Sequence, residues 1–174
     1  MKLRTVVRRF LLPSFLVRLL YYWRYRTLVG PRAEVEYAPG ARWGAGCVIS
    51  SFTKIKVNGP LDVGRRVHIA TGCFIAVDEG GLTIGDNVLI GPNVAITTTN
   101  YVYDQLGIPL HEQGYTSKGV RIGKNVWLGA NSCVMDGAVI GDDVIVSAGS
   151  VVSGPIPANA IVQGNPARVI FTRR

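Results

Sequence analysis

This sequence has few of the side chains from which metal and redox sites are built. Its 174 residues include two histidines, His68 and His111, and three cysteines. Two histidines are too few for a three-histidine zinc centre. The cysteines, Cys47, Cys73 and Cys133, show no CxxC spacing and cannot form a complete set of disulfides. We therefore expect no metal site, and we interpret the cysteines as small apolar residues of a protein in the reducing cytoplasm.

Acidic residues are missing from the first part of the chain. The first of them is Glu34, whereas seven of the 19 lysines and arginines lie between Lys2 and Arg26. The rest of the chain carries 12 basic and 11 acidic residues, so seven of the eight net positive charges belong to the N-terminal segment. A nucleic-acid groove needs basic residues spread over the folded body. We therefore expect no nucleic-acid partner.

The N-terminal segment also lacks an apolar run long enough to cross a membrane. Its longest uncharged run, FLLPSFLV, has eight residues, whereas a spanning helix needs about 20. Arg18 ends this run without a small-x-small cleavage site, and Pro13 interrupts any helix. Arginines and the aromatic cluster YYW favour the headgroup region of an anionic bilayer. We interpret residues 1–30 as a helical arm that binds the inner face of a membrane through residues 1–28, with packing on the body or on another subunit as the alternative.

The remainder of the chain has a strong six-residue period. Branched aliphatic residues occupy every sixth position: Ile122, Leu128, Val134, Ile140, Val146 and Val152. Three positions after each comes, in turn, Asn125, Asn131, Gly137, Asp143, Gly149 and Pro155. Asn, Asp and Gly tolerate a positive φ, so these positions predict a left-handed corner in each repeat. The same pattern continues upstream, where Phe52 and Arg66 are exceptions to the residue type.

A repeat with one inward aliphatic side chain, one inward small side chain and one corner predicts a short strand followed by a turn. Three such repeats close a triangle of about 18 residues, and successive coils stack by strand pairing about 4.8 Å apart. The sequence thus predicts an all-β triangular solenoid over residues 31–160, rather than a β-sandwich, followed by a cap segment, residues 161–174. In this register Cys47 and Cys73 point inward, and Cys133 points outward.

The period is interrupted once. It stops after Ile96 and resumes at Ile122, which leaves roughly 20 residues more than one coil of the solenoid requires. We expect these residues to form a long loop, residues 101–120, inserted at one corner of the solenoid.

Three segments resemble the hexapeptide-repeat acyltransferases: IGDNVLIGPNVAI, IGKNVWLGANSCVMDGAVIGDDVIVSAGSVV and GNPARVI. The resemblance covers residues 60–170 and extends to galactoside and maltose O-acetyltransferases, and still more to the O-acetyltransferases of bacterial surface polysaccharides. It implies a left-handed parallel β-helix and a homotrimer that binds acetyl-CoA between adjacent subunits. It also implies acetyl transfer to a sugar hydroxyl of a surface glycan or lipid-linked saccharide, with a loop histidine as general base.

The same resemblance places the family's loop residues on this chain, with one departure. Asn100 and Asp104 match the family's Asn and Asp, but Tyr101 stands where the catalytic histidine is expected. A phenol has a pKa of about 10 and is a poor general base near neutral pH. His111 of the same loop and His68 of a neighbouring subunit are alternative bases.

Two further readings of Tyr101 stay open. A nearby cation, Arg121 or Lys124, would lower the pKa of its phenol. Otherwise the protein is a catalytically silent trimeric scaffold.

By the same resemblance, small residues line the channel for the pantetheine arm of the cofactor: Gly129, Ala130, Ser147 and Ala148. Ser153 keeps the hydroxyl of the family's threonine, but Gly154 replaces the lysine that meets a nucleotide phosphate. Arg168, in GNPAR, remains as a phosphate partner.

Overall fold

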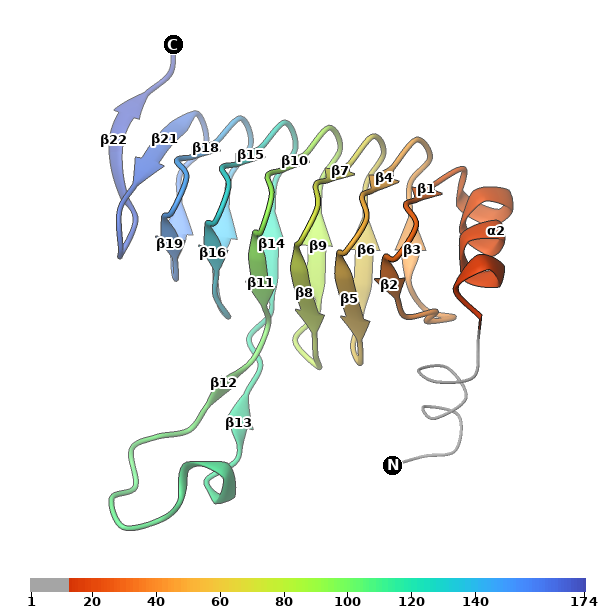
Figure 1. The fold of residues 1–174 in the computed structure, drawn as a ribbon. Coiled ribbons are helices and arrows are strands. Elements are labelled where there is room, and N and C mark those ends of the chain that lie inside the picture. Colours follow the sequence, from red (N-terminus) through yellow and green to blue (C-terminus); the bar gives the residue numbers. More distant parts are fainter. Residues whose placement is uncertain (1–12) are drawn as a thin grey trace.

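A computed structural model describes residues 13–174 of the protein. Short strands stack into a straight column whose three faces are parallel sheets (Figure 1). The first face consists of β1 (Leu28–Val29), β4 (Val48–Ile49), β7 (His68–Ile69), β10 (Leu89–Ile90), β15 (Trp127–Leu128), β18 (Ile145–Val146) and β21 (Ala160–Gln163), which β22 (Arg168–Thr172) joins antiparallel. The predicted parallel β-helix is confirmed.

The other two faces contain six strands each. The second face consists of β2 (Glu34–Val35), β5 (Lys54–Val57), β8 (Phe74–Val77), β11 (Ala95–Thr97), β16 (Cys133–Val134) and β19 (Val151–Val152). The third face consists of β3 (Arg42–Trp43), β6 (Leu61–Val63), β9 (Leu82–Ile84), β14 (Val120–Ile122), β17 (Val139–Ile140) and β20 (Pro155–Ile156). The chain passes through the faces in this order, so we name the corners 1–2, 2–3 and 3–1.

The core is a set of aliphatic ladders inside the column. On the first face, each two-residue strand buries its second residue, and these residues are Val29, Ile49, Ile69, Ile90, Leu128 and Val146. A second ladder of small side chains precedes this face, and it includes Cys47. Cys47 and Cys73 are buried as predicted, and burial raises the pKa of both thiols. The thiolate is the reactive form of cysteine, so these residues act as packing groups.

The corners follow the predicted left-handed conformation with two corrections. Asn125, Asn131 and Asp143 have φ of 55°, 58° and 59°. Phe52 and Arg66, which did not fit by residue type, take the same conformation with φ of 61° and 55°. The expected corner at Pro155 is wrong, because the proline ring holds φ negative and the residue instead pairs with Val139 in the third face.

The coils are not all of one length, in line with the slips in the six-residue period that the sequence shows near residues 55–57 and 80–82. The coil from Val48 to its paired residue His68 is two residues longer than the coil from Trp127 to its paired residue Ile145. The N-terminal coils are longer because strands such as β5 have four residues and bury two of them. The extra two residues keep the alternation of inward and outward side chains, so the core ladder is unbroken.

Helix α2 (Ser14–Tyr25) covers the N-terminal end of the column (Figure 1). The Tyr21 ring is buried with its centroid 5.6 Å from that of Trp43, and Arg18 Nε donates to the Val29 carbonyl at 3.0 Å. This part of the arm therefore packs on the body. Phe15 and Trp23 remain exposed on the helix, so contact with an anionic membrane stays a prediction, which vesicle flotation would test.

Residues 1–12 of the predicted membrane-binding arm lie outside the described residues. Within residues 13–174, no helix combines the length and apolar character needed to span a bilayer.

Replacing Arg66 with asparagine should raise the free energy of unfolding by about 1 kcal/mol, because asparagine tolerates the left-handed conformation that disfavours other L-residues. Asparagine already occupies the equivalent corner one coil further, at Asn87. Urea denaturation of the variant and of Arg66→Ala, which removes the same side chain without asparagine's tolerance of a positive φ, measures the difference. A destabilised Arg66→Asn protein would contradict this account of the corner.

Candidate active site

The predicted loop leaves the column at corner 2–3, between β11 and β14. Its stem is an antiparallel pair, β12 (Asn100–Tyr101) with β13 (Tyr115–Thr116), in which Asn100 faces Thr116 and Tyr101 faces Tyr115. The loop projects away from the column as a long arm (Figure 1). The sequence predicted the insertion and its position, but not the paired stem, because pairing depends on backbone contacts between distant residues.

Buried polar groups fix the base of this loop. Asp136, 6% exposed, accepts the backbone N–H groups of Lys118 and Gly119, both at 2.8 Å. The Ser117 hydroxyl donates to the Thr98 carbonyl at 2.6 Å and accepts the Gly80 N–H at 2.8 Å. Hydrogen bonds to a charged acceptor are stronger than neutral ones. The stem is therefore held in one orientation relative to the column.

The end of the loop carries exposed apolar side chains. A 3-10 helix, η2 (Leu110–Glu112), lies there, and Gln113 closes the turn by donating to the carbonyls of Gln105 and Ile108. Leu106 is 98% exposed, and Leu110 is also exposed. Exposed apolar side chains that form a contiguous patch are typical of an interaction surface.

The structure separates the predicted catalytic groups of the loop. Tyr101 lies on the stem with 62% of its surface exposed, whereas His111 lies on η2 with Nε2 3.6 Å from Glu112 Oε1. Asp104 is exposed, and within residues 13–174 its carboxylate has no hydrogen-bond or ion-pair partner. A single chain therefore does not join Tyr101, Asp104 and His111 into a hydrogen-bonded set.

The other proposed bases and cations lie on different parts of the column. His68 is on β7 of the first face, away from the corner that carries the loop. Lys124 lies at corner 3–1, where its Nζ is 3.6 Å from Asp142 Oδ2. Arg121 lies on β14, the strand that follows the loop stem in the chain.

The stem carries a second tyrosine, Tyr115, which contacts a glutamate, Glu79, and sequence reasoning missed both. The Tyr115 hydroxyl donates to Glu79 Oε1 at 3.4 Å, and the negative charge of Glu79 raises the pKa of the Tyr115 phenol. Tyr115 therefore stays protonated at neutral pH and acts as a hydrogen-bond donor. The two residues are far apart in sequence, so the hexapeptide period gives no signal for their contact.

The small residues predicted to line the cofactor channel share corner 1–2. Gly129 and Ala130 follow β15, and Ser147 and Ala148 follow β18 one coil further. A Cβ on Gly129 would lie 2.5 Å from the Ala148 backbone nitrogen, so stacking of the coils requires glycine there. Ala148 is exposed, which leaves this corner open to a ligand.

The remaining cofactor candidates divide between two places. Arg168 begins β22, pairs with Gln163 and is exposed. Ser153 and Gly154 follow β19 at corner 2–3, the corner that carries the loop. In a single chain, the predicted cofactor residues of corner 1–2 and Tyr101 of corner 2–3 thus emerge at different corners.

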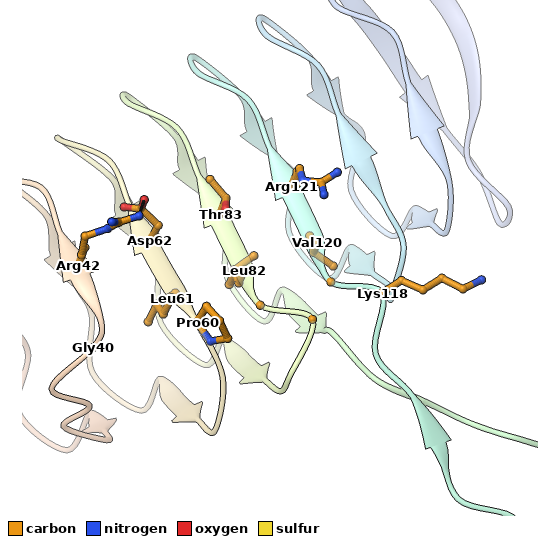
Figure 2. Close-up of a pocket in the computed structure, with 13 residues that line it drawn as sticks. Gly40, Arg42, Pro60, Leu61, Asp62, Leu82, Thr83, Lys118, Val120 and Arg121 are labelled. Carbon is orange, nitrogen blue, oxygen red and sulfur yellow. Dashed lines mark hydrogen bonds and ion pairs between the residues drawn. The ribbon is translucent and has the colours of Figure 1, made fainter.

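A cavity of about 300 Å³ adjoins the base of the loop at corner 2–3 (Figure 2). It lies across β3, β6, β9 and β14, and its polar side chains are those of Arg42, Asp62, Thr83, Lys118 and Arg121. Sequence reasoning did not identify this cavity. Among residues 13–174, no group of three or more His, Cys, Asp or Glu side chains is arranged to hold a metal ion.

Two family models match the chain. The bacterial transferase hexapeptide model (six repeats) matches residues 119–154, and the hexapeptide repeat of succinyl-transferase matches residues 81–110.

Two relatives show how far the similarity extends. The chain is 37% identical over 117 residues to galactoside O-acetyltransferase of Escherichia coli K12, covering 62% of this chain and 54% of that protein. The chain thus spans about half the length of the galactoside O-acetyltransferases that it matches. It is 30% identical over 174 residues to WbbJ of Escherichia coli K12, a putative lipopolysaccharide biosynthesis O-acetyl transferase, covering 95% of this chain and 85% of that protein.

A solved structure shares the fold over nearly the same extent. A variant of AntD, an N-acyltransferase from Bacillus cereus crystallised with dTDP and coenzyme A, superposes with a TM-score of 0.75. The two sequences are 25% identical, and the match covers 90% of this chain and 88% of AntD. With the repeat, the stacked corners and the near-complete match to WbbJ, the chain belongs to the hexapeptide-repeat acyltransferases.

Proposed function

We propose that the protein transfers an acetyl group from acetyl-CoA to a hydroxyl of a sugar, during synthesis of a surface glycan or lipid-linked saccharide. The observation that carries this proposal is the loop at corner 2–3, whose paired stem exposes Tyr101 and whose base adjoins a polar cavity. The near full-length similarity to WbbJ supports a saccharide acceptor. In this reaction the sugar oxygen forms a bond to the thioester carbonyl carbon, the carbon–sulfur bond breaks, and the hydroxyl proton passes through a base to the coenzyme A sulfur.

A homotrimer would complete the site. Tyr101 and the small residues around Ala148 lie at different corners, so one copy's loop and another copy's corner 1–2 are needed to bring them together. A ring of identical subunits joins two different surfaces at each contact. The exposed apolar side chains of Leu106 and Leu110 support burial of the loop against a second copy. A monomeric mass by light scattering under assay conditions would contradict this assembly.

A catalytically silent scaffold is the second candidate. It is favoured by the tyrosine at the catalytic position, and by Gly154, which leaves open space where the family's lysine is expected. This protein would still form the trimer but would not turn over acetyl-CoA.

Replacing Ala148 with tryptophan should abolish acetyl-CoA binding, because Ala148 is exposed at corner 1–2 and an indole there would fill the channel. Isothermal calorimetry measures the affinity, and a thiol reagent measures release of coenzyme A in the presence of saccharides. Lys124→Trp, an exposed change at corner 3–1, is the matched control. Coenzyme A binding that survives Ala148→Trp would place the channel elsewhere, and a wild-type protein that binds no coenzyme A would favour the scaffold.

A further inference from the structure

Helix α2 is apolar on the side that faces away from the column. Its inner stripe packs on the core and consists of Val17, Tyr21 and Tyr25. At about 3.6 residues per turn, positions 15, 19 and 23 lie on the opposite side of the helix. We name these residues, Phe15, Leu19 and Trp23, the outer stripe, and all three are exposed. A helix that is apolar on opposite sides is normally covered on both. Residues 13–174 of one chain cover only the inner side.

A hollow lies beside the outer stripe, between α2 and β1. Its volume is about 410 Å³, and its lining includes the outer stripe, Arg18 and Leu28. Leu28 is an exposed residue of β1, the edge strand of the first face. The apolar surface therefore continues from the helix onto the end of the column. A contiguous exposed apolar patch of this kind is typical of an interaction surface.

The charge around the outer stripe has one sign. Helix α2 carries Arg18 and Arg24, and Arg26 follows it, whereas the first acidic residue of the chain is Glu34. The hydrogen bond from Arg18 Nε to the Val29 carbonyl holds one of these charges beside the hollow. The arginines of two copies would repel each other, whereas an anionic surface would attract them. Tyr and Trp side chains are enriched at the headgroup level of bilayers. Charge and side-chain type therefore favour an anionic bilayer over a second copy of the chain.

We propose that the outer stripe of α2 inserts into the headgroup region of an anionic bilayer, so that the column stands on the membrane with its N-terminal end. A helix of this kind lies in the plane of the interface with its apolar side buried. Helix α2 lies across one end of the column and β22 lies at the other, so β22 points away from the membrane (Figure 1). This inference goes beyond the proposed function and does not depend on acetyl transfer.

Flotation of the full-length protein with vesicles tests the docking. We expect the protein to float with vesicles of phosphatidylcholine and phosphatidylglycerol, and to bind about tenfold or more weakly to phosphatidylcholine alone, which lacks the attraction to arginine. Phe15→Gln should weaken binding about tenfold, because it loses the burial of a large apolar side chain. Phe171→Gln is the matched control, since Phe171 is 58% exposed on β22, against 59% for Phe15, and should bind as the wild type does. Unchanged circular dichroism shows that both variants are folded.

Tryptophan fluorescence tests the orientation. Trp23 belongs to the outer stripe, whereas Trp127 is exposed on β15 of the first face, several coils away from α2. Vesicles with brominated acyl chains quench only tryptophans that lie close to the bilayer. We expect strong quenching in the wild type and in Trp127→Phe, and little quenching in Trp23→Phe.

Several outcomes would overturn the docking. They are absence of flotation, equal binding of the wild type and Phe15→Gln, equal binding to both kinds of vesicle, and full quenching in Trp23→Phe. A wild type that does not float, together with a lower mass of Phe15→Gln by light scattering, would assign the outer stripe to a contact between copies instead. A protein that floats but transfers no acetyl group would retain the docking and reject the proposed function.

Discussion

Replacing Tyr101 with histidine is expected to raise the rate of acetyl transfer by about 10²-fold or more, because general-base catalysis typically contributes 10²–10⁴-fold. An unperturbed phenol is only about 0.1% ionised at neutral pH, whereas an imidazole is largely unprotonated there. Tyr101 is 62% exposed on a paired stem, so the smaller ring fits without repacking the loop. The measurement is kcat/KM for acetyl transfer as a function of pH.

Two further variants serve as controls for this experiment. Tyr103→His adds an imidazole two residues along the same loop, at another exposed tyrosine, and should leave the rate unchanged. Tyr101→Ala should abolish the residual wild-type activity if the phenol takes part in catalysis. Equal rates in Tyr101→His, Tyr101→Ala and wild type would place the base elsewhere, with His111 as the next residue to replace.

Replacing Asp136 with alanine should lower the free energy of unfolding by about 2–4 kcal/mol, because two backbone N–H groups lose a charged acceptor. The N–H of Gly119 is buried, so water replaces the carboxylate poorly. The loop stem should lose its fixed orientation, and acetyl transfer should fall together with stability. Chemical denaturation and limited proteolysis of the loop measure the two effects.

Asp136→Asn is the matched control, since an amide oxygen can still accept both N–H groups. It should retain the protease resistance of the loop and most of the stability. If alanine and asparagine behaved alike, the two hydrogen bonds would not be what holds the stem.

The six-residue repeat could be predicted from the sequence because it depends on residue types that are close together in the chain. An aliphatic residue such as Leu128 must face the core, and a residue such as Asn125 must turn the corner three positions earlier. Both requirements depend on residue type and on spacing along the chain. The buried thiols of Cys47 and Cys73 and the position of the inserted loop followed from the same register.

The sequence did not predict a left-handed φ at Arg66 and Phe52, because hydrogen bonds to a neighbouring coil set the backbone conformation there. Arg66 takes a left-handed φ because its N–H must reach the Ala45 carbonyl of the preceding coil. Phe52 does so because its N–H donates to the Arg32 carbonyl in the same way. Hydrogen bonds between stacked coils require the same backbone conformation at the equivalent corner of each coil. A single residue that disfavours a positive φ therefore still adopts it.

Residue types at fixed intervals along the chain specify the column, its corners, the inserted loop and the family. The surroundings of the loop depend instead on how the coils pack: the hydrogen bonds from Asp136, the contact of Tyr115 with Glu79, and the cavity lined in part by Lys118, Arg121 and Thr83. The physical reason is that a period of six specifies which side chains face inward. The neighbours of an outward side chain come from other coils, distant in sequence, and their meeting depends on how the coils stack.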